Sequence, residues 1–225
     1  MKKEKYIIFD SSALINMISN GLFDLILKLK KEFAGHFIIT PGVKYETLEH
    51  PKKIQRFEWG AVRIEELISL GVLEEAKEFF NEQEIIRETQ KMLLKANNML
   101  YANTKPISLV EEGEIECLAL SKILNEKGIE NISVIDERTA RLLVENPENL
   151  KKIIEQKVHS PILIKGDFSY FQNIKIIRST ELAFIAIKKQ LLEIHDKDAL
   201  EALLYALKFG GASITEKEIQ VMKKS

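Results

Sequence analysis

Short, largely apolar runs alternate along the chain with stretches whose apolar residues recur every three or four positions. The runs at residues 6–9, 37–40, 132–135 and 174–177 are rich in β-branched and aromatic side chains, which predicts buried strands. A further short strand is predicted at residues 161–164. Because helical stretches separate the strands, the pattern predicts an α/β protein with three layers, in which helices cover both faces of a central parallel sheet.

Two of the helical stretches, residues 52–70 and 74–101, are long and highly charged, and Gly71 lies where they join. Their length and short connection predict an antiparallel helical hairpin inserted into the α/β unit at about residues 52–101. We therefore expect one domain over residues 1–194 that contains this insertion. Residues 195–225 are expected to form a C-terminal helical appendage, either packed on the domain or contacting a second copy in a homodimer.

Acidic residues recur where predicted strands end and helices begin. Asp10 and Asp136 directly follow apolar runs, while Glu46 and Glu114 lie in the first turns of predicted helices. Taken alone, Asp10 is interpreted as a helix N-cap. Parallel strands, however, bring their carboxyl ends to one edge of the sheet, so we expect the four carboxylates to meet there. Glu116 is an alternative to Glu114, because it too lies within an apolar helical pattern, where a carboxylate is costly unless something binds it.

Converging carboxylates repel one another unless a cation neutralises them. Mg²⁺ and Mn²⁺ prefer oxygen ligands and couple carboxylates to phosphate oxygens. A zinc site is not expected, because the four histidines show no pair at helical ligand spacing. They are His36, His50, His159 and His195. Two ions roughly 3.5–4 Å apart activate a water and stabilise a leaving oxygen, which is the chemistry of phosphodiester hydrolysis.

Composition narrows the setting of this chemistry. The chain of 225 residues has 33 Lys plus Arg against 34 Asp plus Glu, a net charge of -1, which argues against binding to nucleic acid through bulk positive charge alone. The single cysteine, Cys117, cannot form an internal disulfide, and no run approaches the ~18 apolar residues of a membrane span. We therefore expect a cytoplasmic protein without a membrane partner.

The residues around the four acids resemble the motifs of a known family. Ile-Ile-Phe-Asp-Ser-Ser-Ala-Leu at Asp10, Val-Lys-Tyr-Glu at Glu46, Gly-Glu-Ile-Glu-Cys-Leu-Ala-Leu at Glu114 and Val-Ile-Asp-Glu-Arg-Thr-Ala-Arg at Asp136 look like the acidic motifs of PIN-domain proteins, in the same order. The resemblance covers about residues 5–146 apart from the predicted insertion. It implies a PIN-like fold and Mg²⁺- or Mn²⁺-dependent endoribonuclease activity on RNA. Because the family includes the toxins of VapBC-type toxin–antitoxin pairs as well as rRNA-processing nucleases, an antitoxin-like protein partner is also implied.

The resemblance implies a role for each matching residue. Asp10, Glu46, Glu114 and Asp136 correspond to the metal-coordinating, catalytic acids. Ser12 corresponds to the small polar residue that helps to order the first acid. The family often has Asp where this chain has Glu114, so Glu116 competes for that role in a shifted register.

Residues near Asp136 are further candidates. Glu137 is placed to share the function of Asp136 or replace it. Arg138 and Arg141, three apart on one predicted helix face, are candidates for contacts to RNA phosphates. They are equally well interpreted as a solvated face or as partners of Glu137 and Glu145.

Two other functional classes are considered. One is a PIN-like module that binds RNA or protein without cutting, which the third motif and the predicted insertion favour. The other is an aspartyl phosphatase of the haloacid-dehalogenase type. That class requires a second Asp two residues after the first, where this chain has Ser12, so it ranks last.

Overall fold

The computed structural model describes residues 4–110, 112–192, 196 and 198–224, so His195 and the predicted domain boundary at residues 194 and 195 lie outside the described part. Within it, five parallel strands form one sheet in the order β3-β2-β1-β6-β8. The strands are β1 Lys5–Phe9, β2 His36–Ile39, β3 Glu74–Glu75, β6 Glu130–Val134 and β8 Ile176–Ile177. Strand β1 is central, with Ile7 paired to Phe37 on one side and to Ile132 on the other. The predicted α/β class with a parallel sheet is confirmed.

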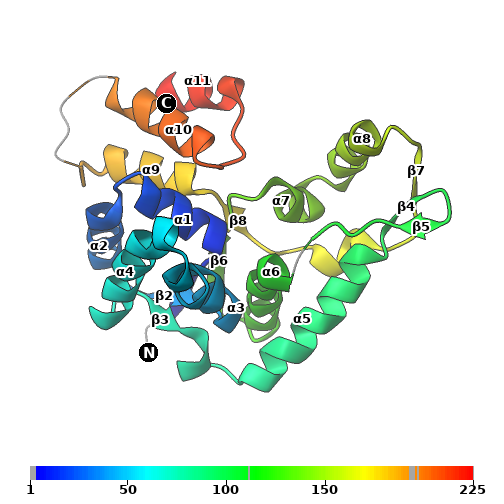
Figure 1. Cartoon of the computed structure of the whole chain (residues 1–225), viewed down its shortest axis with the longest axis horizontal. Coiled ribbons are helices and arrows are strands. Elements are labelled where there is room, and N and C mark those ends of the chain that lie inside the picture. Colours follow the sequence, from blue (N-terminus) through cyan, green and yellow to red (C-terminus); the bar gives the residue numbers. More distant parts are fainter. Residues whose placement is uncertain (1–3, 111, 193–195, 197, 225) are drawn as a thin grey trace.

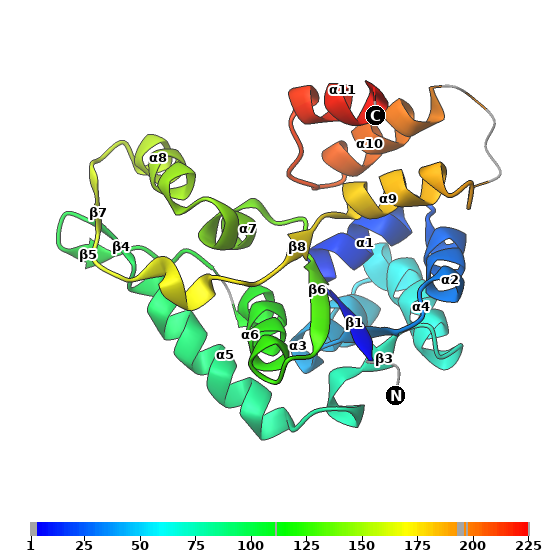
Figure 2. The ribbon, with the colours of Figure 1, turned by 180° about the vertical axis from the view of Figure 1, so that it is seen from behind.

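Helices lie on both sides of this sheet (Figures 1 and 2). They are α1 Ser11–Ser19, α2 Phe23–Glu32, α3 Pro41–Lys44, α4 Gln55–Ser69, α5 Glu82–Asn97, α6 Glu112–Glu126, α7 Arg138–Glu145, α8 Pro147–Val158, α9 Ser179–Lys188, α10 Ala199–Phe209 and α11 Glu216–Lys224. Helices α1, α2, α4 and α9 lie together on one side, and α5, α6 and α7 on the other. Helix α6 is buried nearly all round, which its mostly apolar sequence explains.

The prediction of an antiparallel helical hairpin at residues 52–101 is wrong. Helix α4 packs on α1, whereas α5 packs along α6 on the other side of the sheet (Figure 1). Between them, residues that were expected to begin a helix form the edge strand β3, in which Glu74 and Glu75 pair with Ile38 and Ile39. Charged residues are common on edge strands because they discourage pairing with other chains. Their acidic side chains are matched by cations, including Lys44 at 2.6 Å from Glu75.

The predicted strand at residues 161–164 exists but does not join the main sheet. It forms β7 Ile162–Ile164 in a second, three-stranded antiparallel sheet with β4 Leu100–Ala102 and β5 Lys105–Pro106. This small sheet lies at the far end of α5 from the main sheet (Figure 1). The chain thus folds around one central sheet and carries a projecting arm built from α5 and the second sheet.

The C-terminal helices α10 and α11 form a small unit with its own apolar centre of Leu204, Ile214 and Ile219. Helix α10 lies along α9, so the unit covers one side of the main body (Figure 2). Among the described residues, no single helix meets the length and hydropathy needed to cross a membrane, and only the sharply bent pair of α1 and α2 does so jointly.

Candidate functional site

The first candidate residue, Asp10, lies at the carboxyl end of the central strand. Its backbone N–H donates to the Val134 carbonyl at 3.0 Å, which ties it to β6, and its extended backbone makes it the N-cap of α1. Oδ2 accepts hydrogen bonds from the Ser12 N–H at 3.2 Å and from the Ser12 hydroxyl. The other oxygen, Oδ1, is buried and has no hydrogen-bond partner among the described residues. Since Asp10 is only 1% exposed, this carboxylate has one oxygen satisfied and one left open.

Glu46 lies on a π-helical turn, Tyr45–Glu49, that continues α3. Such turns are rare and occur frequently at functional sites. One oxygen of the Glu46 carboxylate, Oε2, accepts a hydrogen bond of 2.5 Å from the Ser11 hydroxyl at the start of α1. The other, Oε1, lies against Gly113 of α6, where an added Cβ would be only 2.1 Å away. Glu46 therefore reaches both the residue beside Asp10 and the first turn of α6.

The third acid has two candidates on α6, and the structure separates them. Glu116 is 8% exposed, and its Oε2 accepts a hydrogen bond of 2.7 Å from the Gly42 N–H. Its carboxylate thus meets the N-terminus of α3, where backbone N–H groups favour negative charge. Glu114 is half-buried in the first turn of α6, directly after the glycine that Glu46 approaches.

The carboxylates of this region influence one another. Burial, with a smaller contribution from the negative charge of Glu46, raises the pKa of Asp10 to about 6 against the opposing hydrogen bonds from Ser12. Burial also raises the pKa of Glu116, with smaller contributions from the charges of Glu112 and Glu46. Asp10, Glu46 and Glu116 therefore form one electrostatically coupled group, called here the acidic cluster.

Asp136 lies at the same edge of the sheet but is held differently. Its carboxylate accepts hydrogen bonds from the Asn16 side chain at 2.7 Å, the Ser179 N–H at 2.8 Å and the Ser179 hydroxyl at 2.6 Å. These bonds fill three of about four acceptor sites of a carboxylate. Asp136 thus connects β6 to α1 and α9.

Asn16, which the sequence analysis did not single out, is the centre of these contacts. Its amide also donates to the Leu207 carbonyl at 3.0 Å, and a Cβ on Gly210 would lie 2.0 Å from its side-chain oxygen. Asn16 therefore joins Asp136 to the end of α10. The available signal was a lone amide in the apolar run of residues 13–18. The sequence analysis also missed three hydroxyl residues of this region, Ser11, Thr40 and Ser179. Of these, only Ser11 could have been found from the sequence, because it directly follows Asp10.

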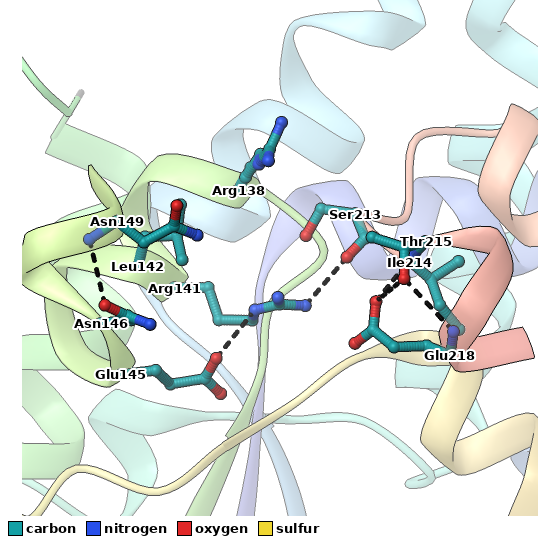
Figure 3. A pocket seen from close by; sticks show the side chains of 10 residues that line it. All are labelled: Arg138, Arg141, Leu142, Glu145, Asn146, Asn149, Ser213, Ile214, Thr215 and Glu218. Carbon is teal, nitrogen blue, oxygen red and sulfur yellow. Dashed lines mark hydrogen bonds and ion pairs between the residues drawn. The ribbon is translucent and has the colours of Figure 1, made fainter. Parts of the chain in front are cut away.

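The residues after Asp136 begin α7. Glu137 is the N-cap of that helix and accepts a hydrogen bond of 2.7 Å from the Ala140 N–H. Arg141 is held in place by the Ser213 carbonyl at 3.0 Å and by Glu145, whose carboxylate lies 3.0 Å from its Nε. Arg138 is exposed and points away from that pair, as Figure 3 shows.

Arg138 and Arg141 line a polar pocket of about 420 Å³ between the α7–α8 region and the C-terminal segment (Figure 3). The wall on the C-terminal side includes Ser213 and Glu218. Ser213 also donates its N–H to the Asp136 carbonyl at 3.1 Å, so the pocket borders the fourth predicted acid. Arg138 is therefore available to an incoming anion, whereas Arg141 mainly joins α7 to the C-terminal segment.

The acidic cluster offers oxygen ligands of the kind that a divalent cation prefers. Among the residues that the structure describes, no three His, Cys, Asp or Glu side chains lie close enough together to hold a metal ion. Mg²⁺ commonly binds through one or two carboxylates and keeps several waters, so a complete protein cage is not required. The open, buried Oδ1 of Asp10 and the neighbouring charge of Glu46 fit such a cation. No family model, no curated protein and no solved structure matches the chain.

Proposed function

We propose that this protein is a Mg²⁺- or Mn²⁺-dependent endoribonuclease with a PIN-like fold. The observation that carries the proposal is the buried Asp10 carboxylate, which has one oxygen without a partner among the described residues and the Glu46 charge beside it. A buried carboxylate in this state is costly, and a bound cation removes the cost. The order of the four acidic motifs supplies the choice of RNA hydrolysis among metal-dependent reactions.

In this proposal Asp10 and Glu46 hold the metal, and the α6 acids complete the site. The bound cation supplies Lewis-acid stabilisation and a water of lowered pKa. Ser12 and Ser11 fix the orientation of Asp10 and Glu46 by their hydrogen bonds. Glu114 is the third ligand of this proposal. Glu116, whose carboxylate the Gly42 N–H holds, is the alternative third ligand and adds to the negative potential of the site.

Other residues of the proposed site contact the substrate or hold the surrounding helices and strands in place. Arg138 contacts a phosphate of the RNA, since its exposed guanidinium forms no ion pair among the described residues. Asp136 joins β6, α1 and α9 through its hydrogen bonds and has about one acceptor site left open. Because hydrogen bonds within the protein already occupy most of the Asp136 carboxylate, a second candidate function is a PIN-like module that binds RNA without cleaving it.

Cleavage of labelled RNA separates the two functions. Purified protein is expected to cut single-stranded RNA with Mn²⁺ present and not with EDTA, and Asp10→Asn and Glu46→Gln are expected to lose the activity. Glu148→Gln, at an exposed position in the first turn of α8, is the matched control and is expected to cut like the unaltered protein. Cleavage that is equal in Asp10→Asn contradicts the proposal.

A further inference from the structure

The polar pocket between the α7–α8 region and the C-terminal segment, called here the α7 pocket, is large enough for a small ligand. Its volume of about 420 Å³ lies within the range of small-molecule sites. Ser213 in one wall donates its N–H to the Asp136 carbonyl at 3.1 Å, and α7 in the other wall begins at Arg138. A ligand in the α7 pocket therefore lies beside the fourth predicted acid.

The α7 pocket has one charge without a partner. Four charged side chains line it. Glu145 lies 3.0 Å from Arg141, and Glu218 lies 2.9 Å from Arg178. Arg138, by contrast, forms no ion pair within the part of the chain that the structure describes. Because a guanidinium binds phosphate oxygens with two parallel hydrogen bonds, the pocket favours a phosphate at Arg138.

A second guanidinium spans the α7 pocket. Arg141 donates to the Ser213 carbonyl at 3.0 Å, and its Nε lies 3.0 Å from the Glu145 carboxylate, so contacts in both walls hold it (Figure 3). A guanidinium fixed in this way is flat and rigid, and nucleic-acid bases stack on such planes. Leu142 and Ile214, both buried, add apolar atoms to the lining. The pocket thus offers a surface for a flat ring.

Two polar groups in the walls are placed to bond a ligand. The Ser213 hydroxyl is buried and has no hydrogen-bond partner among the described residues. In Figure 3 it points from the C-terminal segment towards α7. In the opposite wall the Asn146 oxygen caps α8 by accepting from the Asn149 N–H at 3.0 Å, which leaves its amide nitrogen as a donor. Since buried polar groups normally have partners, the unpaired hydroxyl favours a polar ligand.

We propose that the α7 pocket binds one nucleotide of the RNA substrate, with its phosphate at Arg138, its base on the Arg141 guanidinium and the base bonded to the Ser213 hydroxyl. A phosphate alone would leave the Arg141 surface and the hydroxyl unused, and an apolar ligand would leave Arg138 without a partner. A nucleotide combines the three features. This inference rests on the proposed function, and it adds a subsite that selects the nucleotide beside the cleaved bond.

Calorimetric titration in EDTA with each of the four nucleoside 5′-monophosphates tests the α7 pocket without any cleavage. At least one of them is expected to bind saturably, and inorganic phosphate is expected to bind at least tenfold more weakly. Ser213→Ala keeps the backbone contacts of this residue and is expected to weaken nucleotide binding about fivefold to tenfold, as loss of one hydrogen bond does. Arg141→Lys keeps the charge without the flat guanidinium and is expected to weaken it at least as much.

Ser133→Ala is the matched control. The Ser133 hydroxyl is also buried without a partner among the described residues, but it belongs to β6 and is not part of the pocket lining. This variant is expected to bind nucleotides like the unaltered protein. The inference is overturned if no nucleotide binds saturably, if inorganic phosphate binds as tightly as every nucleotide, or if Ser133→Ala and Ser213→Ala have equal effects.

A free nucleotide and a nucleotide within RNA share this chemistry, and cleavage distinguishes them. In Mn²⁺, RNAs that differ at one position are expected to be cut preferentially beside the nucleotide that binds most tightly, and Ser213→Ala is expected to reduce that preference. Nucleotide binding with an unchanged preference in Ser213→Ala contradicts the substrate subsite and leaves a site for free nucleotides. Nucleotide binding that Ser213→Ala weakens, without cleavage of any RNA, contradicts the nuclease and supports the pocket in a binding module.

Discussion

Replacing Asp10 by Asn is expected to abolish activity and yet stabilise the fold. The carboxylate is buried, one of its oxygens has no partner among the described residues, and its pKa lies at about 6 against an ordinary value of 3.8. Asn retains the capping oxygen at the start of α1, because Asn is as good an N-cap as Asp. The substitution therefore removes the buried charge without removing the cap.

The size of the effect follows from linkage. An acid whose pKa is raised in the folded state keeps its proton there after the unfolded chain has lost it, so stability falls as pH rises from about 4 to about 6 and is then constant. A difference of about two pH units corresponds to about 3 kcal/mol at neutral pH. The free energy of unfolding of Asp10→Asn is expected to exceed that of the unaltered protein by up to this amount.

Urea unfolding in EDTA between pH 4 and pH 8 measures this gain. The stability difference between Asp10→Asn and the unaltered protein is expected to be small near pH 4, to grow to pH 6, and to stay level above it. Mn²⁺ is then expected to stabilise the unaltered protein but not the variant, because ligands that bind only the folded state add stability by mass action. A variant that is less stable at pH 7, or whose advantage is the same at every pH, would refute the reasoning.

Two other substitutions test the framework of the site. Gly113→Ala is expected to reduce RNA cleavage at least tenfold, because the added Cβ displaces the Glu46 carboxylate. Gly60→Ala is the control: its added Cβ meets nothing within 4 Å, so cleavage is expected to be unchanged and stability to rise by about 0.5–1 kcal/mol. The RNA cleavage assay and urea unfolding measure both variants. Asn16→Ala is expected to lower the free energy of unfolding by about 2–3 kcal/mol, because it removes a hydrogen bond to the buried Asp136 carboxylate. A change smaller than about 0.5 kcal/mol, the size typical of surface substitutions, would contradict that role.

The central strands could be predicted because their residues are buried on both faces. β1 and β2 are apolar runs, β6 ends in one at residues 132–135, and a parallel sheet follows from the helices between them. The strand β3 could not be predicted in this way. It has two residues, both Glu, and it is a strand only because it pairs with Ile38 and Ile39 of β2. Tertiary pairing here overrides the helical pattern of its neighbours.

The acids at strand ends could be located from the sequence, but their contacts could not. Helix α6 is buried nearly all round, so its sequence has no polar face to show which way Glu114 and Glu116 point. Two residues apart on a helix, they point in nearly opposite directions. The hydrogen bond from Gly42 that holds Glu116 depends on where α3 begins, and that is a long-range feature. The partners of Asp136 are equally distant, since Ser179 is 43 residues away.

Calorimetric titration with Mn²⁺ tests most directly whether the acidic cluster is a metal site. The unaltered protein is expected to bind Mn²⁺ saturably, and Asp10→Asn is expected to bind it at least tenfold more weakly while remaining folded. Glu148→Gln is expected to bind like the unaltered protein. Equal Mn²⁺ affinity in the unaltered protein and in Asp10→Asn, or no saturable binding to either, would contradict the account.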